Sequence, residues 1–204
     1  MAQLQPLSAE LEKQREEYVQ LLRAGQLSPY SLPAVASVVE EAVLARAWAR
    51  TSYLSEAVGS RIYVLSVAGT HPRVKVGMTA CVRSRIVTHL NEYHCNGHGL
   101  VDAWISNAFL DAGRVETGMH KLLRISHRTS YRREEYPGTD FESICDLAAY
   151  FDVRLSLTED QVRFHEWKQQ DRARTRAEGR LRVVEPHATR AVQVGDADGE
   201  TDSS

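Results

Sequence analysis

The hydrophobic positions divide the chain into a helical beginning, a middle that alternates strands with helices, and a helical end. Near the N-terminus, apolar side chains recur at helical spacing over residues 11–22 and 38–49. This spacing predicts a helix from Ser8 up to Gly25 and a second helix over about residues 34–57. The two helices are expected to form a hairpin that packs either on the next domain or on a second copy of the chain, as a homodimer.

The middle of the chain changes to short β-rich runs. Two such runs flank a turn that contains Gly69 and Pro72, which is typical of a β-hairpin. The predicted order is strands over residues 62–67 and 73–78, a helix over 80–93, a strand over 100–106, and a helix from 109 or 111 to 125. This β-β-α-β-α order predicts an α+β domain with a three-stranded antiparallel sheet, flanked by N- and C-terminal helices.

The last third of the chain returns to helical spacing. A helix is expected over residues 140–151, followed by a long, charged helix from 157 to about 180, and the final residues are acidic and poor in apolar side chains, which favours a disordered tail. The predicted regions are therefore helical (1–60), α+β (61–151), a charged helix (152–184) and a tail (185–204).

Composition narrows the class of protein. Hydrophobic residues make up 43% and charged residues 25% of the 204 positions, as in globular proteins. No apolar run is long enough to span a membrane, and the first twenty residues lack the apolar core of a secretion signal. Three scattered cysteines do not make a disulfide framework, so a reducing, cytoplasmic location is expected.

The charge is distributed unevenly. Residues 61–136 hold eleven Lys and Arg against six Asp and Glu, together with six of the eight histidines, whereas both flanks are acidic. Phosphate contacts need cationic side chains, so a basic middle favours a polyanionic partner such as DNA.

Several residues with catalytic chemistry follow one another in the middle segment. Eleven residues separate Tyr63 from Lys75, which begins a Lys-Val-Gly triplet, and Arg85 and His89 follow on the next helix at i, i+4 spacing. Glu116 begins a Glu-x-x-x-His sequence on the last predicted helix of this segment. Over about residues 61–136, this pattern resembles the GIY-YIG endonuclease superfamily, in the branch whose second motif begins with Lys.

The resemblance implies metal-dependent hydrolysis of a DNA phosphodiester bond. It implies that Tyr63 generates or orients the attacking water, that Arg85 stabilises charge on the phosphate, and that His89 assists proton movement. Glu116 would bind one Mg²⁺ or Mn²⁺ ion. Lys75 would lower the pKa of Tyr63 or contact phosphate.

Elementary chemistry agrees with these roles. Hard divalent cations prefer carboxylate oxygens, and a tyrosine whose ordinary pKa is about 10 needs a nearby cation to act as a base. Arg83, Arg85 and Lys121 are the expected contacts to nucleic acid. The chain departs from the family pattern at Arg61, where the first motif usually has Gly, and at Lys75 and Val76, where the second has Tyr and Ile.

Other interpretations of the same residues stay open. His89, His94, Cys95 and His98 form a cluster that offers zinc ligands, although it lacks a paired Cys-x-x-Cys, and polar loop residues with ordinary partners are the alternative. For the whole chain, the alternatives to a nuclease are a catalytically weak or inactive nucleic-acid-binding module and a helical assembly protein.

Overall fold

The structure is a computed structural model that describes residues 5–26, 34–51, 58–127 and 134–184, with side chains described up to residue 177. The predicted turn over 27–33, the predicted end of the second helix at 52–57 and the acidic tail lie outside these ranges. The chain divides into two compact units, residues 1–165 and 166–204.

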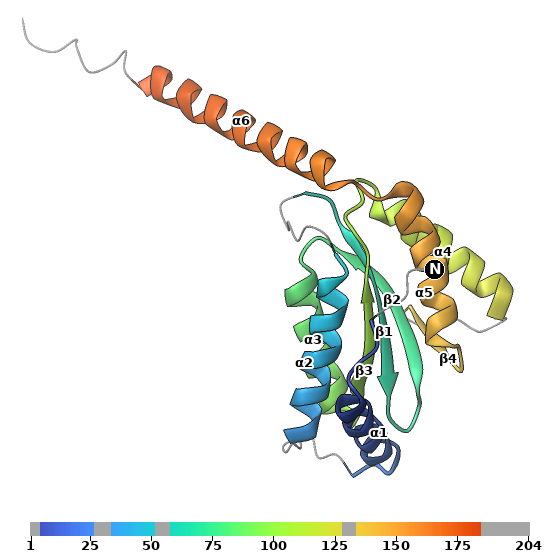
Figure 1. The fold of residues 1–204 in the computed structure, drawn as a ribbon. Coiled ribbons are helices and arrows are strands. Elements are labelled where there is room, and N and C mark those ends of the chain that lie inside the picture. Colours follow the sequence, from blue (N-terminus) through green and yellow to red (C-terminus); the bar gives the residue numbers. More distant parts are fainter. Residues whose placement is uncertain (1–4, 27–33, 52–57, 128–133, 185–204) are drawn as a thin grey trace, which may run out of the picture. The chain divides into compact units, whose positions relative to one another are not determined.

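The first unit is built on a four-stranded antiparallel sheet (Figure 1). Its strands are β1 (Arg61–Ala68), β2 (Arg73–Thr79), β3 (Gly99–Ile105) and β4 (Glu135–Pro137), in the order β3-β1-β2-β4. The predicted α+β class and the first three strands are confirmed, but the prediction of a three-stranded sheet is wrong. β4 is only three residues long and too short to show a hydrophobic period, and its proline is compatible with an edge strand.

Strand register places two of the predicted site residues on one face. Tyr63 on β1 is directly opposite Gly77 on β2, and Lys75 is opposite Leu65. Side chains alternate along a strand, so Tyr63, Leu65, Lys75 and Gly77 all belong to the same face of the sheet.

Three helices cover this face. They are α1 (Ala9–Arg23), α2 (Ala34–Ala49) and α3 (Val82–Cys95). Their apolar side chains, among them Tyr18, Val43 and Ile86, share one core with Leu65 and Val67 of the sheet. The N-terminal hairpin therefore packs on the next segment of its own chain, which is one of the two arrangements that the sequence left open.

Two helices, α4 (Ala112–His127) and α5 (Phe141–Leu155), cover the opposite face. Val115 and Met119 on α4 and Ile144 on α5 pack on Ile62 and Val76. Asp140 caps α5, because its carboxylate accepts a hydrogen bond from Ser143 N at 2.8 Å. These contacts fix α4, which carries Glu116, against β1 and β2.

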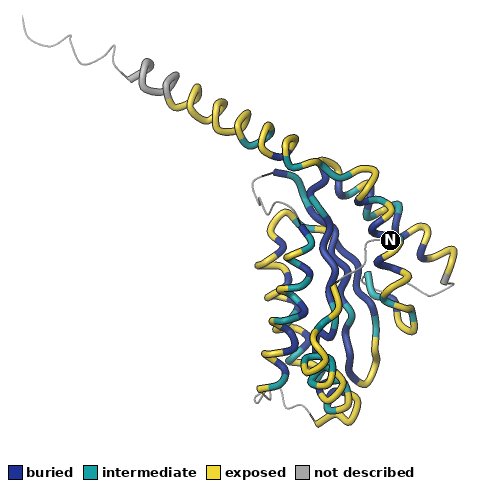
Figure 2. The backbone as a smooth tube through the Cα atoms, viewed as in Figure 1, coloured by how far each residue is buried: buried dark blue, intermediate teal, exposed yellow. Residues whose placement is uncertain are grey.

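The last helix, α6 (Glu159–Val184), begins in the first unit and ends in the second. In the second unit, residues 167–177 are all exposed, as the polar character of the predicted helix led us to expect (Figure 2). None of the helices within the described residues is long and apolar enough to cross a membrane.

Candidate active site at the edge of the sheet

The centre of the candidate site is a hydrogen bond between two predicted catalytic residues. Tyr63 Oη lies 3.0 Å from His89 Nε2, and both side chains are buried. β1 supplies the tyrosine and α3 supplies the histidine, so the packing of α3 on the sheet sets their distance. On its other side, His89 Nδ1 lies 3.8 Å from Glu92 Oε2. This distance is too long for a hydrogen bond, but the carboxylate attracts a proton on Nδ1 and so favours the tautomer in which Nε2 accepts from the tyrosine.

A glycine makes room for Tyr63. A Cβ atom at Gly77 would lie 2.4 Å from Tyr63 Oη, closer than any side chain tolerates. The glycine of the Lys-Val-Gly triplet therefore has a physical reason, since the tyrosine ring lies directly over it.

Burial suppresses charge on both groups. Burial raises the pKa of Tyr63, a hydrogen bond and the positive charge of Arg85 oppose that rise, and Glu134 and Glu116 add to it. The resemblance implied that Lys75 would either lower the pKa of Tyr63 or contact phosphate, and the net shift of the Tyr63 pKa is upward. Burial, with Lys75 and Arg85 nearby, lowers the pKa of His89 to about 4. At neutral pH the pair is thus a phenol and a neutral imidazole.

Arg85 and Lys75 supply the positive charges of the site. Arg85 is exposed on α3 and interacts with the Tyr63 hydroxyl, so its guanidinium can also reach a phosphate from solvent. Lys75 is buried, and its Nζ lies 3.5 Å from Glu134 Oε2. Glu134 directly precedes β4, and its backbone oxygen accepts a hydrogen bond from Val76 N at 3.0 Å.

The predicted metal ligand, Glu116, lies in a cluster with two residues that the sequence analysis did not select. Glu116, His120 and Glu134 each offer a ligand atom, and these atoms all lie within 4.8 Å of one another. Two carboxylates and one imidazole suit a divalent cation. The Glu-x-x-x-His sequence placed His120 one turn after Glu116, but nothing in the sequence around Glu134 indicated that it would join them.

The expected nucleic-acid contacts are not on one surface. Arg83 is exposed on α3, where its guanidinium lies over the Trp48 ring at 5.3 Å. Lys121 is exposed on α4, which covers the opposite face of the sheet. Arg61, which replaces the family's glycine, is buried and donates a hydrogen bond to Ser106 O at 3.0 Å.

The four residues of the zinc alternative are not grouped around a common point in the structure. His89 is bonded to Tyr63, and His94 Nε2 lies 3.0 Å from Glu40 Oε1. Cys95 is exposed, and the His98 ring packs against Gly69. Within the described ranges, Glu116, His120 and Glu134 are the only three such ligands that come close together.

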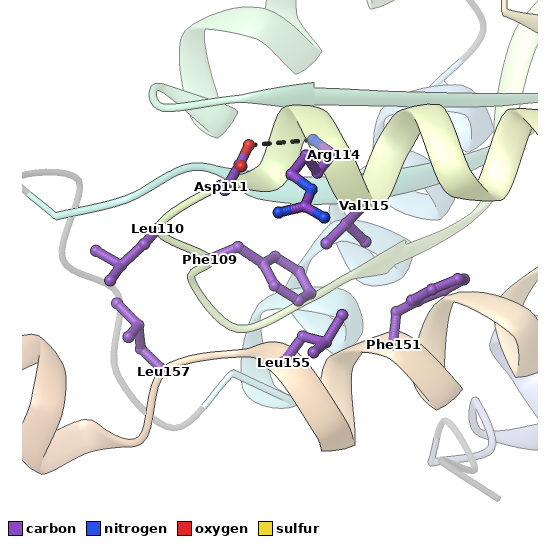
Figure 3. Close-up of a pocket in the computed structure, with 8 residues that line it drawn as sticks. All are labelled: Phe109, Leu110, Asp111, Arg114, Val115, Phe151, Leu155 and Leu157. Atoms are coloured by element: carbon purple, nitrogen blue, oxygen red, sulfur yellow. Dashed lines mark hydrogen bonds between the residues drawn. The ribbon is translucent and has the colours of Figure 1, made fainter.

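An apolar pocket of about 470 Å³ lies elsewhere in the first unit. Figure 3 shows side chains from the start of α4 facing those at the end of α5. Its lining consists of Phe109, Leu110, Asp111, Arg114, Val115, Phe151, Leu155 and Leu157. None of the predicted catalytic residues contributes to it, so the pocket does not coincide with the candidate site.

Comparison with known proteins adds no family assignment. No family model, no curated protein and no solved structure matches this chain. The interpretation of the site therefore rests on its own residues and geometry.

Proposed function

We propose that this chain is a divalent-metal-dependent endonuclease of the GIY-YIG type that hydrolyses phosphodiester bonds in DNA. The observation that carries the proposal is the buried hydrogen bond between Tyr63 and His89, with Arg85 beside it and Glu116 within electrostatic reach. Four side chains that the sequence pattern ordered along the chain thus interact in three dimensions.

Tyr63 and His89 move the proton in this scheme. With the imidazole proton on Nδ1, the Tyr63 hydroxyl donates to His89 Nε2, and its oxygen can accept a hydrogen bond from the attacking water. As the water loses a proton to the tyrosine oxygen, the tyrosine proton passes to the imidazole. His89 can take it because burial keeps the ring neutral above about pH 4.

Arg85 and Glu116 handle the negative charge of the phosphate. Arg85 is positioned to donate hydrogen bonds to its oxygens as charge develops in the transition state. Glu116 would hold the divalent cation, and its neighbours His120 and Glu134 fit such an ion by donor type and spacing. When bound, Mg²⁺ or Mn²⁺ would offset phosphate charge and make an attacking water more acidic.

Plasmid cleavage tests the proposal. The wild-type chain should nick or linearise supercoiled DNA with Mg²⁺ or Mn²⁺ and not with a chelator. Glu116→Gln keeps the side-chain shape but removes the anion, so cleavage should fall by roughly 10²-fold or more. Glu142→Gln, an exposed glutamate on α5, is the matched control and should cleave normally.

Binding of DNA without metal separates the nuclease from the alternative. Glu116→Gln should bind DNA as tightly as the wild type or more tightly, because a carboxylate that repels phosphate is gone. A wild-type chain that binds DNA but cleaves under no divalent metal would be a nucleic-acid-binding module. Absence of any salt-sensitive DNA binding would overturn both functions.

A further inference from the structure

The cluster of Glu116, His120 and Glu134 is built from segments that lie apart in the sequence. Glu116 and His120 share a face of α4, and Glu134 precedes β4 at the edge of the sheet. His120 is buried, whereas the Glu116 and Glu134 side chains are 17% and 35% exposed. An ion could therefore approach from the carboxylate side and meet the imidazole at the back of the cluster.

Tyr136 fixes the orientation of His120. Its hydroxyl is hydrogen-bonded to His120 Nδ1, and the two rings are stacked with centroids 5.8 Å apart. Tyr136 is itself fully buried, so the surrounding core holds its ring in place. Anchoring one imidazole nitrogen in this way directs the other toward a ligand, as in metal sites whose histidines are held by a second hydrogen bond.

The spacing of the other nitrogen suits a shared cation. His120 Nε2 lies 3.8 Å from Glu116 Oε1, which is too long for a hydrogen bond. Two donors that each lie about 2.1 Å from one ion are separated by roughly 3 to 4 Å. The observed separation falls in that range.

The positive charge of Lys75 would compete with a bound cation for Glu134. Its ammonium lies 3.5 Å from Glu134 Oε2, so without a bound ion it offsets part of the negative charge of the cluster. A divalent cation that recruits Glu134 would weaken this pair and release the Lys75 ammonium toward the Tyr63 side of the site, since both residues lie on the same face of the sheet.

We propose that Glu116, His120 and Glu134 together form one divalent-cation site, and that it prefers Mn²⁺ to Mg²⁺ and Ca²⁺. The preference follows from the imidazole, which is a better ligand for transition metals than for the harder alkaline-earth ions. This inference deepens the proposed function by naming the ion class and two further ligands, but ion binding does not require cleavage.

A titration of the full chain with Mn²⁺ tests the site without DNA. The electron paramagnetic resonance signal of the free ion measures how much Mn²⁺ remains unbound. One ion should bind, and Glu134→Gln should weaken binding about tenfold or more. Glu135→Gln is the matched control, because this adjacent glutamate pairs with Arg73 at 3.1 Å instead. Its affinity should equal that of the wild type. Lys75→Met should bind Mn²⁺ more tightly, since the competing cation is removed.

Competition experiments test the preference. Mg²⁺ should displace Mn²⁺ from the wild type only at an excess of about tenfold or more, and His120→Gln should reduce that excess. Equal loss of affinity in Glu134→Gln and Glu135→Gln, or no Mn²⁺ binding at millimolar concentration, would overturn the site. Mn²⁺ binding that depends on Glu134 in a chain that never cleaves DNA would overturn the proposed function while supporting the site. Mg²⁺-dependent cleavage by Glu134→Gln at the wild-type rate would overturn the three-ligand site alone.

Discussion

The two halves of the candidate site differ in how much solvent reaches them. Tyr63 and His89 are 1% and 3% exposed, whereas the side chains of Glu116 and Glu134 are 17% and 35% exposed. The inner pair is neutral at neutral pH, because burial raises the pKa of Tyr63 and lowers that of His89 to about 4. The outer half keeps its carboxylates near water, where an ion can reach them.

In the proposed mechanism, this difference in solvent exposure gives the two halves separate tasks. A buried, uncharged pair holds no desolvated ion at rest, and a charge arises on His89 only when the imidazole takes up the proton. A partly exposed pair of carboxylates can exchange a cation with solvent. Lys75 lies between the two, since it is paired with Glu134 and its charge also lowers the pKa of His89.

The largest expected effect on DNA cleavage comes from disrupting the inner half of the site, the Tyr63–His89 pair. Tyr63→Phe keeps the ring but removes the hydroxyl that is bonded to His89, so DNA cleavage should fall by about 10²-fold or more. Tyr93→Phe is the matched control: Tyr93 is equally buried, its ring stacks on His89, and its hydroxyl has no hydrogen-bond partner within the described ranges. Plasmid cleavage rates should separate the two variants. Equal rates in both would remove Tyr63 from the mechanism.

A second test uses the titration of His89. The folded pKa of about 4 lies below the ordinary value of 6.5, so the unfolded chain binds this proton more readily. The contribution of His89 to stability is therefore complete above pH 6.5 and is lost as the pH falls toward 4, by at most about 3 kcal/mol. Urea unfolding of the wild type and of His89→Gln between pH 7 and pH 4 measures it. The wild type should lose more stability than the variant, and parallel curves would contradict the buried, neutral histidine.

The third test moves Tyr63 without altering its chemistry. Gly77→Ala places a Cβ 2.4 Å from Tyr63 Oη, which forces the buried ring away from His89 and should destabilise the fold by roughly 1–3 kcal/mol. Gly113→Ala on α4 is the control, because its new Cβ would meet nothing closer than 3.9 Å, and it should be neutral or slightly stabilising. The midpoint temperature of thermal unfolding and the cleavage rate should both fall in Gly77→Ala, and neither should fall in Gly113→Ala.

Patterns along the chain predicted the inner half of the site better than the outer half. The hairpin of β1 and β2 and the i, i+4 placement of Arg85 and His89 follow from local periodicity, and they bring Tyr63 to His89 once α3 packs on the sheet. The sequence could not predict the register that pairs Tyr63 with Gly77. A slip of one residue would move the Tyr63 side chain to the other face of the sheet.

The outer half depends on contacts between distant segments. β4 has three residues and no readable period, so neither the fourth strand nor the position of Glu134 beside it was predicted. Glu134 also has a positive φ of 62°, a conformation that non-glycine residues seldom adopt and that sequence does not indicate for glutamate. The role of Tyr136 in orienting His120 likewise appears only when β4 is placed beside β2.

The smallest expected effect lies outside both halves and concerns DNA affinity alone. Arg83 and Arg85 are both exposed on α3, two positions apart, but Arg85 interacts with Tyr63 whereas Arg83 lies over Trp48. Arg83→Ala should lower DNA affinity by about threefold at physiological salt. The slope of affinity against salt concentration should fall by the amount expected for the loss of about one phosphate contact. The cleavage rate of bound DNA should stay unchanged. Arg85→Ala should lower both affinity and that rate, because its guanidinium interacts with Tyr63 and, in the proposed mechanism, would contact the reacting phosphate. Fluorescence anisotropy at several salt concentrations, with single-turnover cleavage, measures the two quantities separately. A loss of cleavage in Arg83→Ala as large as that in Arg85→Ala would show that the site extends along α3 beyond the Tyr63–His89 pair.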